Sequence, residues 1–132
     1  MSPTRERRDR QVRGRTLWRV LLVLAVVVQL VVLYWPKDPG GGGVGNLDKV
    51  VHAAVFGAVA LAGRGAGVPW RPLALVLVVH AGLSEVIQGT LLPDRHGDPA
   101  DAVADVTGTV LGLLAAHARL RAGGRRRVPR AR

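Results

Sequence analysis

Long apolar runs alternate with short polar stretches along the chain, and their lengths predict membrane-spanning helices. Residues 17–35 form one run of 19 residues, in which Arg19 and Gln29 are the only strongly polar side chains. About 20 apolar residues, at 1.5 Å each, cross the hydrocarbon core of a bilayer, whereas a small soluble domain cannot bury such a run. The same pattern predicts four spanning helices, at residues 17–35, 48–68, 72–92 and 99–120.

Proline and glycine mark the connections between these runs. Pro36 and the four glycines at 40–43 predict a loop after the first helix, and Pro72 fits the first turn of the third. The start of the chain resembles a secretory signal. However, its apolar run is longer than the usual 7–15 residues and no small-x-small pair precedes Pro36, so we expect an uncleaved first helix.

The distribution of charge predicts the orientation of the helices. The chain carries 19 Lys and Arg residues and a net charge of +10. With the N-terminus inside, 16 of the 19 lie in cytoplasmic segments, and Lys37, Lys49 and Arg95 lie outside. The positive-inside rule therefore predicts an all-α membrane protein with both termini in the cytoplasm, including the basic segments 1–16 and 121–132. The basic segments lack interleaved aromatic residues, so no nucleic-acid binding is expected.

Most of the acidic residues fall on the outer side of the predicted helices. Asp48 and His52 share one face of a helix, as do Glu85 and Gln88, and as do Asp101 and Asp105. On the last helix, Gly108 and Gly112 continue the polar face inward and would let a neighbouring helix approach closely. Because polar residues inside a membrane persist when they face partners, water or a ligand, we expect one polar pocket that opens outward.

These residues resemble the VanZ-like membrane proteins. The matching pattern is Asp48-Lys49-x-x-His52, Glu85-x-x-Gln88, Arg95 with Asp101 six residues later, and Asp105-x-x-Gly108. It covers about half of the chain, and it departs from the family at Asp105, where asparagine is usual. The resemblance implies a multi-pass protein of the bacterial cytoplasmic membrane that is linked to teicoplanin resistance. It also implies that the following polar residues bind a ligand or have another functional role: Asp48, Lys49, His52, Glu85, Gln88, Arg95, Asp101 and Asp105.

Several of these residues also have a simple structural interpretation. Asp98 and Pro99 suit the N-cap and first position of the last helix, and Asp101 suits its first turn. Asp48 could cap the second helix, and Lys49 could reach the outer headgroups. Arg95 could pair with the acids around it or with a lipid phosphate. Two further expectations are that His80 lies opposite Glu85 and packs beside Ser84, and that Gly108 and Gly112 serve helix packing.

Three classes of function follow. The first, which we favour, binds a membrane lipid or a lipid-linked envelope molecule and modulates glycopeptide susceptibility. The second is an intramembrane enzyme with Glu85 as general acid or base and Arg95 holding a phosphate. The third is an accessory subunit. No spacing specifies a cofactor or a metal, so neither is predicted; the alternative is a hard cation such as Ca²⁺ or Mg²⁺ bound by His52, Glu85, Asp101 and Asp105. The chain has no cysteine, which excludes disulfides and thiolate ligands.

Overall fold

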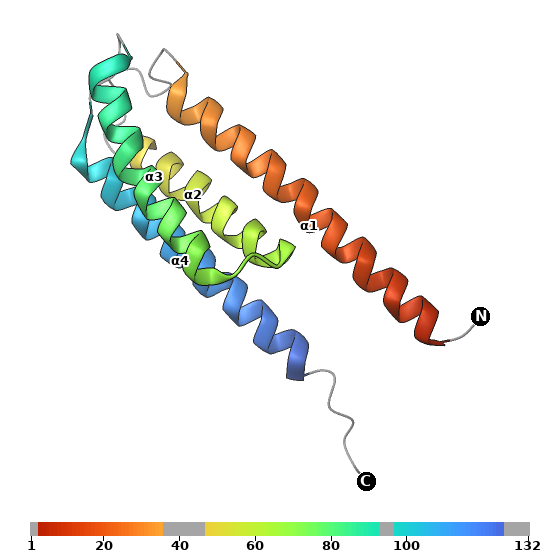
Figure 1. The fold of residues 1–132 in the computed structure, drawn as a ribbon. Coiled ribbons are helices and arrows are strands. Elements are labelled where there is room, and N and C mark those ends of the chain that lie inside the picture. Colours follow the sequence, from red (N-terminus) through yellow and green to blue (C-terminus); the bar gives the residue numbers. More distant parts are fainter. Residues whose placement is uncertain (1–2, 36–46, 93–96, 126–132) are drawn as a thin grey trace.

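Four helices make up the described part of the chain. A computed structural model describes residues 3–35, 47–92 and 97–125. Their helices are α1 (Pro3–Tyr34), α2 (Leu47–Ala66), α3 (Trp70–Leu91) and α4 (Pro99–Arg125). The predicted all-α class is confirmed. Figure 1 shows successive helices running in alternating directions, so that the first and last helices point their chain ends toward the same end of the bundle.

The helix boundaries differ from the predicted ranges mainly at the two ends of the chain. Both α2 and α3 begin and end within two residues of the predicted 48–68 and 72–92. By contrast, α1 begins at Pro3 and therefore includes most of the basic segment, and α4 continues to Arg125 instead of ending at residue 120. Arginine, glutamate and glutamine are good helix formers, so the polar start of α1 continues the helix that its apolar run establishes.

A glycine turn ends α2 and leads directly into α3. Gly67 has a φ of 96°, which side chains with a Cβ rarely adopt. The Val68 N–H donates to the Gly63 carbonyl at 2.9 Å, and the Gly67 N–H donates to the Arg64 carbonyl at 3.1 Å. These two bonds form a Schellman motif, which satisfies the last carbonyls of the helix. The helix consequently stops at Ala66 and does not reach residue 68.

The second helix is central to the packing. It lies between α1 and α4 and packs extensively against both, while α3 packs mainly against α4. The core is apolar and contains Phe56 and Val59 from α2, Leu77 from α3 and Leu33 from α1. Because α2 is covered by its neighbours, its polar residues face other helices more than they face the surroundings of the bundle.

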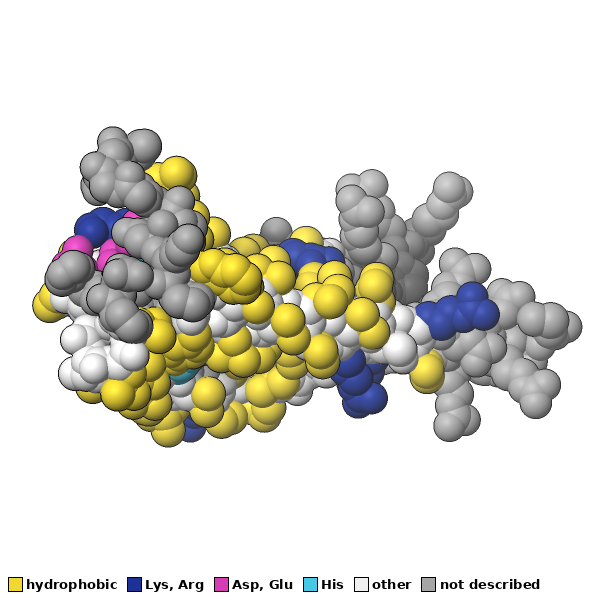
Figure 2. All heavy atoms as spheres, turned by 90° about the horizontal axis from the view of Figure 1, so that it is seen from above, with side chains coloured by type: hydrophobic (Ala, Val, Ile, Leu, Met, Phe, Trp, Pro, Cys, Tyr) yellow, Lys and Arg dark blue, Asp and Glu magenta, His cyan; other side chains and the backbone are white. Residues whose placement is uncertain are grey.

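The outer surface of the bundle is largely apolar, which indicates a membrane protein. Among the described residues, three helical segments are long and apolar enough to cross a membrane: Gln11–Tyr34, Trp70–Leu91 and Pro99–Gly123. Large aliphatic side chains such as Val23, Leu75 and Leu111 are more than half exposed. Figure 2 shows this apolar surface along most of the visible face. In water such a surface would cause association, whereas lipid tails cover it without cost.

Candidate functional site

Ionisable side chains from three helices meet at the end of the bundle where α3 ends and α4 begins. The acidic side chains that are visible in Figure 2 gather at this end. Several of the polar side chains are buried: His52 and Asp105 are 0% exposed, Gln88 is 1% and Asp101 is 4%. We call the following residues the polar cluster: Asp48, Lys49, His52, Glu85, Asp98, Asp101 and Asp105.

At the centre of the polar cluster, α2 and α4 are joined by an imidazole and a carboxylate. His52 Nδ1 lies 3.0 Å from Asp105 Oδ1, and both side chains are fully buried. The other ring nitrogen, Nε2, lies 3.8 Å from Asp48 Oδ1, which is one turn earlier on α2. An imidazole held by a carboxylate on one nitrogen can act through the other as a base, an acid or a metal ligand.

The exposed rim of the polar cluster is an ion-pair network. Lys49 Nζ lies 2.9 Å from Asp98 Oδ2 and 3.3 Å from Asp101 Oδ1. Asp98 Oδ1 also accepts the Ala100 N–H at 2.9 Å, which makes Asp98 the N-cap of α4. The Lys49 ammonium, together with this backbone N–H, lowers the pKa of the Asp98 carboxyl. The expected capping role and a second, interhelical role thus belong to the same side chain.

Two residues of α3 hold the ends of other helices in place. Glu85 Oε2 accepts the backbone N–H of Asp98 at 2.8 Å, so it fixes the start of α4. Gln88 Nε2 donates to the Leu33 carbonyl at 3.1 Å, so it fixes the end of α1. Although the spacing puts Glu85 and Gln88 on one face, they bond to different neighbours.

The small residues of α4 lie in direct contact with α2. A Cβ added to Gly108 would overlap the Ala53 carbonyl, and one added to Gly112 would overlap the Gly57 carbonyl. Gly57, in turn, has the Gly108 carbonyl 3.0 Å from where its own Cβ would lie. This backbone contact is what lets the His52 and Asp105 side chains, one turn away, reach each other.

Other polar contacts were not expected from the sequence. His80 Nε2 lies 3.1 Å from the Tyr34 hydroxyl, and the His80 ring packs on Phe56, with 5.5 Å between ring centroids. The expected partner of His80, Ser84, instead donates to the Ala81 carbonyl at 2.9 Å. Gln29 on α1 is only 2% exposed. Gln29 is one of two strongly polar residues in the first apolar run, and this feature of the sequence could have indicated that it is buried against another helix. Arg95 lies outside the described residues.

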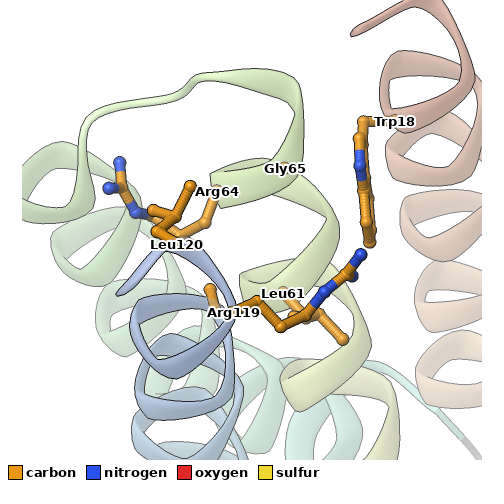
Figure 3. A pocket seen from close by; sticks show the side chains of 7 residues that line it. Trp18, Leu61, Arg64, Gly65, Arg119 and Leu120 are labelled. Atoms are coloured by element: carbon orange, nitrogen blue, oxygen red, sulfur yellow. The ribbon is translucent and has the colours of Figure 1, made fainter. Parts of the chain in front are cut away.

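The opposite end of the bundle carries a cavity of about 170 Å³ between α1, α2 and α4 (Figure 3). It is lined partly by Trp18, Arg64 and Arg119. The Arg119 guanidinium lies 4.5 Å from the centre of the Trp18 ring, in a cation–π contact. Arg64 donates to the Val68 carbonyl at 2.6 Å. These basic groups therefore contact a ring and a backbone oxygen, whereas the acidic groups of the polar cluster are bound by Lys49, His52 and backbone N–H groups.

Comparison with known proteins gives no relative: no family model, no curated protein and no solved structure matches the chain. A functional argument for this protein therefore depends on the geometry of the polar cluster. That geometry has three chemical properties: a buried imidazole–carboxylate pair, an excess of carboxyl groups over basic groups, and a rim that is half exposed.

Proposed function

We propose that this chain is a four-span protein of the bacterial cytoplasmic membrane, with both termini in the cytoplasm. In this proposal the polar cluster binds the headgroup of a membrane lipid or a lipid-linked envelope molecule, and so modulates susceptibility to teicoplanin. The single observation that carries it is the polar cluster itself, at one end of a bundle whose sides are apolar. An amphiphile could lie with its tails along the helices and its headgroup at Lys49 and Asp98.

The energetics of burial support a binding role. An ionised side chain at the centre of a membrane helix costs roughly 2.5–3.5 kcal/mol even on lenient insertion scales. Hydrogen bonds between membrane helices give back typically less than about 1 kcal/mol each. Helix packing alone could therefore be achieved more cheaply by apolar side chains, and a ligand gives a reason for the polar ones to be present.

The charges of the polar cluster indicate which headgroups would fit. Carboxylates accept hydrogen bonds but cannot donate them when ionised. A headgroup rich in donors, such as sugar hydroxyls or amines, would therefore suit the cluster better than a bare phosphate. Among the described residues, Lys49 is the basic side chain at the rim of the cluster. It already donates hydrogen bonds to Asp98 and Asp101, so it is not available to a phosphate.

The proposed topology is supported by the positions of the basic residues and can be tested directly. The chain has no native cysteine, so single cysteines report one position each. Leu47 is half exposed at the end with the polar cluster, and Arg121 is exposed at the other end. We expect Leu47→Cys to react with an impermeant maleimide in intact cells and Arg121→Cys to react only after permeabilisation. The reverse pattern would overturn the orientation.

The proposed effect on susceptibility is tested in a strain that lacks the gene and receives wild-type or variant protein at matched membrane levels. We expect deletion and Glu85→Gln to lower teicoplanin tolerance at least twofold, because the headgroup loses a charged acceptor. His117→Ala is the matched control, since His117 is exposed on α4 far from the cluster. Unchanged tolerance to teicoplanin and vancomycin after deletion would rule out the resistance role.

An intramembrane enzyme is the second candidate, and the His52–Asp105 pair favours it. A general base needs an imidazole that a neighbouring group orients, and Asp105 lies in position to do this. His52→Gln keeps hydrogen-bonding capacity but cannot transfer protons at neutral pH. If the protein only binds, His52→Gln should retain much of the effect on tolerance. If it catalyses a reaction on an envelope precursor, the effect should disappear while binding of the amphiphile persists.

A further inference from the structure

Three side chains of the polar cluster each carry a buried atom without a hydrogen-bond partner in the part of the chain that the structure describes. The atoms are His52 Nε2, Glu85 Oε1 and Asp105 Oδ2. Each belongs to a different helix, and His52 and Asp105 are 0% exposed. Buried polar atoms in native proteins nearly always have a partner, so three of them in one cluster require an explanation.

The same three residues have the spacing of a metal site. His52, Glu85 and Asp105 can each present one ligand atom such that all three atoms lie within 4.8 Å of one another. Neighbouring ligand atoms that are each about 2.1 Å from one tetrahedrally coordinated ion lie about 3.4 Å apart. Side-chain movements of up to about 1 Å would therefore bring all three atoms onto a common ion.

The imidazole is oriented for such an ion. His52 Nδ1 and Asp105 Oδ1 are 3.0 Å apart, which is also the spacing of two neighbouring ligands on one ion. With Nδ1 bound to the ion, Nε2 carries the proton and faces Asp48 Oδ1 at 3.8 Å. A metal-binding histidine usually donates its second N–H to a carboxylate in this way. One ion would thus bind the carboxylates of Glu85 and Asp105, each of which has an unpartnered oxygen, and would leave the proton of His52 on the side of Asp48.

We propose that His52, Glu85 and Asp105 bind one divalent cation, with Asp48 as the outer partner of the imidazole. Charge favours it: among the described residues at this end, five carboxyl groups (Asp48, Glu85, Asp98, Asp101 and Asp105) surround a single lysine, Lys49. A mixed set of nitrogen and oxygen ligands selects Zn²⁺ or Mn²⁺ over Mg²⁺ or Ca²⁺. The sequence offered a cation site only as an alternative, with Asp101 as a fourth ligand and a hard ion; the structure groups His52, Glu85 and Asp105 without Asp101.

The test measures metal binding by the full chain, purified in detergent after removal of its affinity tag. We expect wild-type protein to retain about one Zn²⁺ or Mn²⁺ per chain, measured by mass spectrometry after gel filtration. Calorimetric titration with each metal should show binding at least tenfold weaker in His52→Gln, Glu85→Gln and Asp105→Asn. Metal should also raise the midpoint of thermal unfolding in wild type, because the ion joins α2, α3 and α4, and should not raise it in these variants.

The controls separate a loss of ligands from a loss of fold. His117→Ala should bind as wild type does. Glu85→Gln and Asp105→Asn keep the side-chain shape and remove a buried charge, so their metal-free unfolding midpoints should equal or exceed that of wild type. Pulsed electron paramagnetic resonance of Mn²⁺-loaded wild type, which needs no variant, should detect one imidazole nitrogen coupled to the ion.

Several results would overturn the proposal. They are no bound ion in wild type, no coupled nitrogen, or full binding in the three ligand variants. Binding that requires Asp48 and Asp101 but not Glu85 would reject this ligand set, since those two residues form a second candidate group with His52. The cation site does not depend on the proposed function: metal binding is measured without teicoplanin, and either idea can fail while the other stands.

Discussion

At the end of the bundle where α4 begins, His52 and Asp105 are fully buried and lie 3.0 Å apart. At the opposite end, Arg119 is exposed and rests on the Trp18 ring. Both regions are charged, but the acidic residues pair with Lys49 and His52 across helices, whereas the basic residues contact an aromatic face and a backbone carbonyl. The basic end can satisfy its charges with solvent, while the buried acidic end depends on its own partners.

This difference shows why the same kind of residue carries different information at the two ends. An exposed arginine at the end of a membrane helix orients the protein and tolerates many neighbours. A buried carboxylate needs a specific partner at a specific distance, because an unpaired charge away from water is costly. We therefore expect substitutions at the two ends to differ in size.

The largest loss is expected from His52→Ala. It removes the group that faces Asp105 and leaves the carboxylate buried without that partner, which costs on the order of 3–5 kcal/mol when a buried pair is broken. The measurement is the unfolding midpoint in detergent, followed by tryptophan fluorescence. The exposed His117→Ala serves as control and should change little; equal losses in both variants would contradict the special status of the acidic end.

A smaller loss is expected from Gly108→Ala, which disturbs the contact that supports the polar cluster. The added methyl would overlap the Ala53 carbonyl, so α2 and α4 must separate. Overpacking of this kind typically costs about 1–3 kcal/mol. Gly82→Ala is the matched control: its Cβ would meet nothing within 4 Å. Alanine there should leave stability unchanged or raise it, because alanine favours helix. Tolerance of alanine at both positions would mean that the helices are not held this closely.

Two substitutions of Asp98 distinguish its role as N-cap from its ion pair with Lys49. Asp98→Asn keeps an acceptor for the Ala100 N–H but loses the ion pair with Lys49, whereas Asp98→Ala loses both. Because exposed pairs contribute little, we expect a fall of a few degrees in the unfolding midpoint for alanine and a smaller one for asparagine. If asparagine is as damaging as alanine, the pair with Lys49 matters more than the cap.

The Asp98 carboxyl also predicts how the stability of the protein depends on pH. Its pKa is lowered in the folded protein, so the stabilisation that it contributes is present above the ordinary pKa of aspartate. That contribution is lost as the pH falls through the folded-state value. The difference in unfolding midpoint between wild type and Asp98→Asn should therefore shrink at acidic pH, and a growing difference would contradict it.

The smallest effect is expected at the basic end, from Arg119→Ala. An exposed cation–π contact contributes about 0.5–1 kcal/mol, and Arg119→Lys should retain part of it. The measurement is again the unfolding midpoint, compared directly with that of His52→Ala. A loss at Arg119 as large as that at His52 would show that the two ends hold their charges with similar dependence on partners.

Much of the local structure followed from the sequence. The apolar runs predicted helices close to those of α2 and α3, and Asp98-Pro99 predicted the start of α4. These features depend on neighbours within a few residues, such as a cap, a proline or a helical period. The extension of α1 to Pro3 was not predicted, because the end of an apolar run need not be the end of a helix.

Partners across helices could not be obtained in this way. The spacing placed Glu85 and Gln88 on one face, but Glu85 binds the start of α4 and Gln88 binds the end of α1. Likewise, the period placed His80 away from Glu85 without indicating that it would meet Tyr34. A helical period fixes directions around one axis; it contains no information about which neighbour stands in each direction.

The sequence by itself determined that this chain forms apolar helices and that its acidic and basic residues fall toward opposite ends. Both follow from hydrophobic run lengths and charge positions along one dimension. The sequence predicted one shared polar pocket, but the tertiary structure alone decided which atoms meet in it. The pairing of His52 with Asp105, for example, depends on the close approach of α2 and α4 at Gly108 and Gly112. Differences of less than an ångström in the separation of two helices determine which charges pair. These separations are fixed only once the helices have packed.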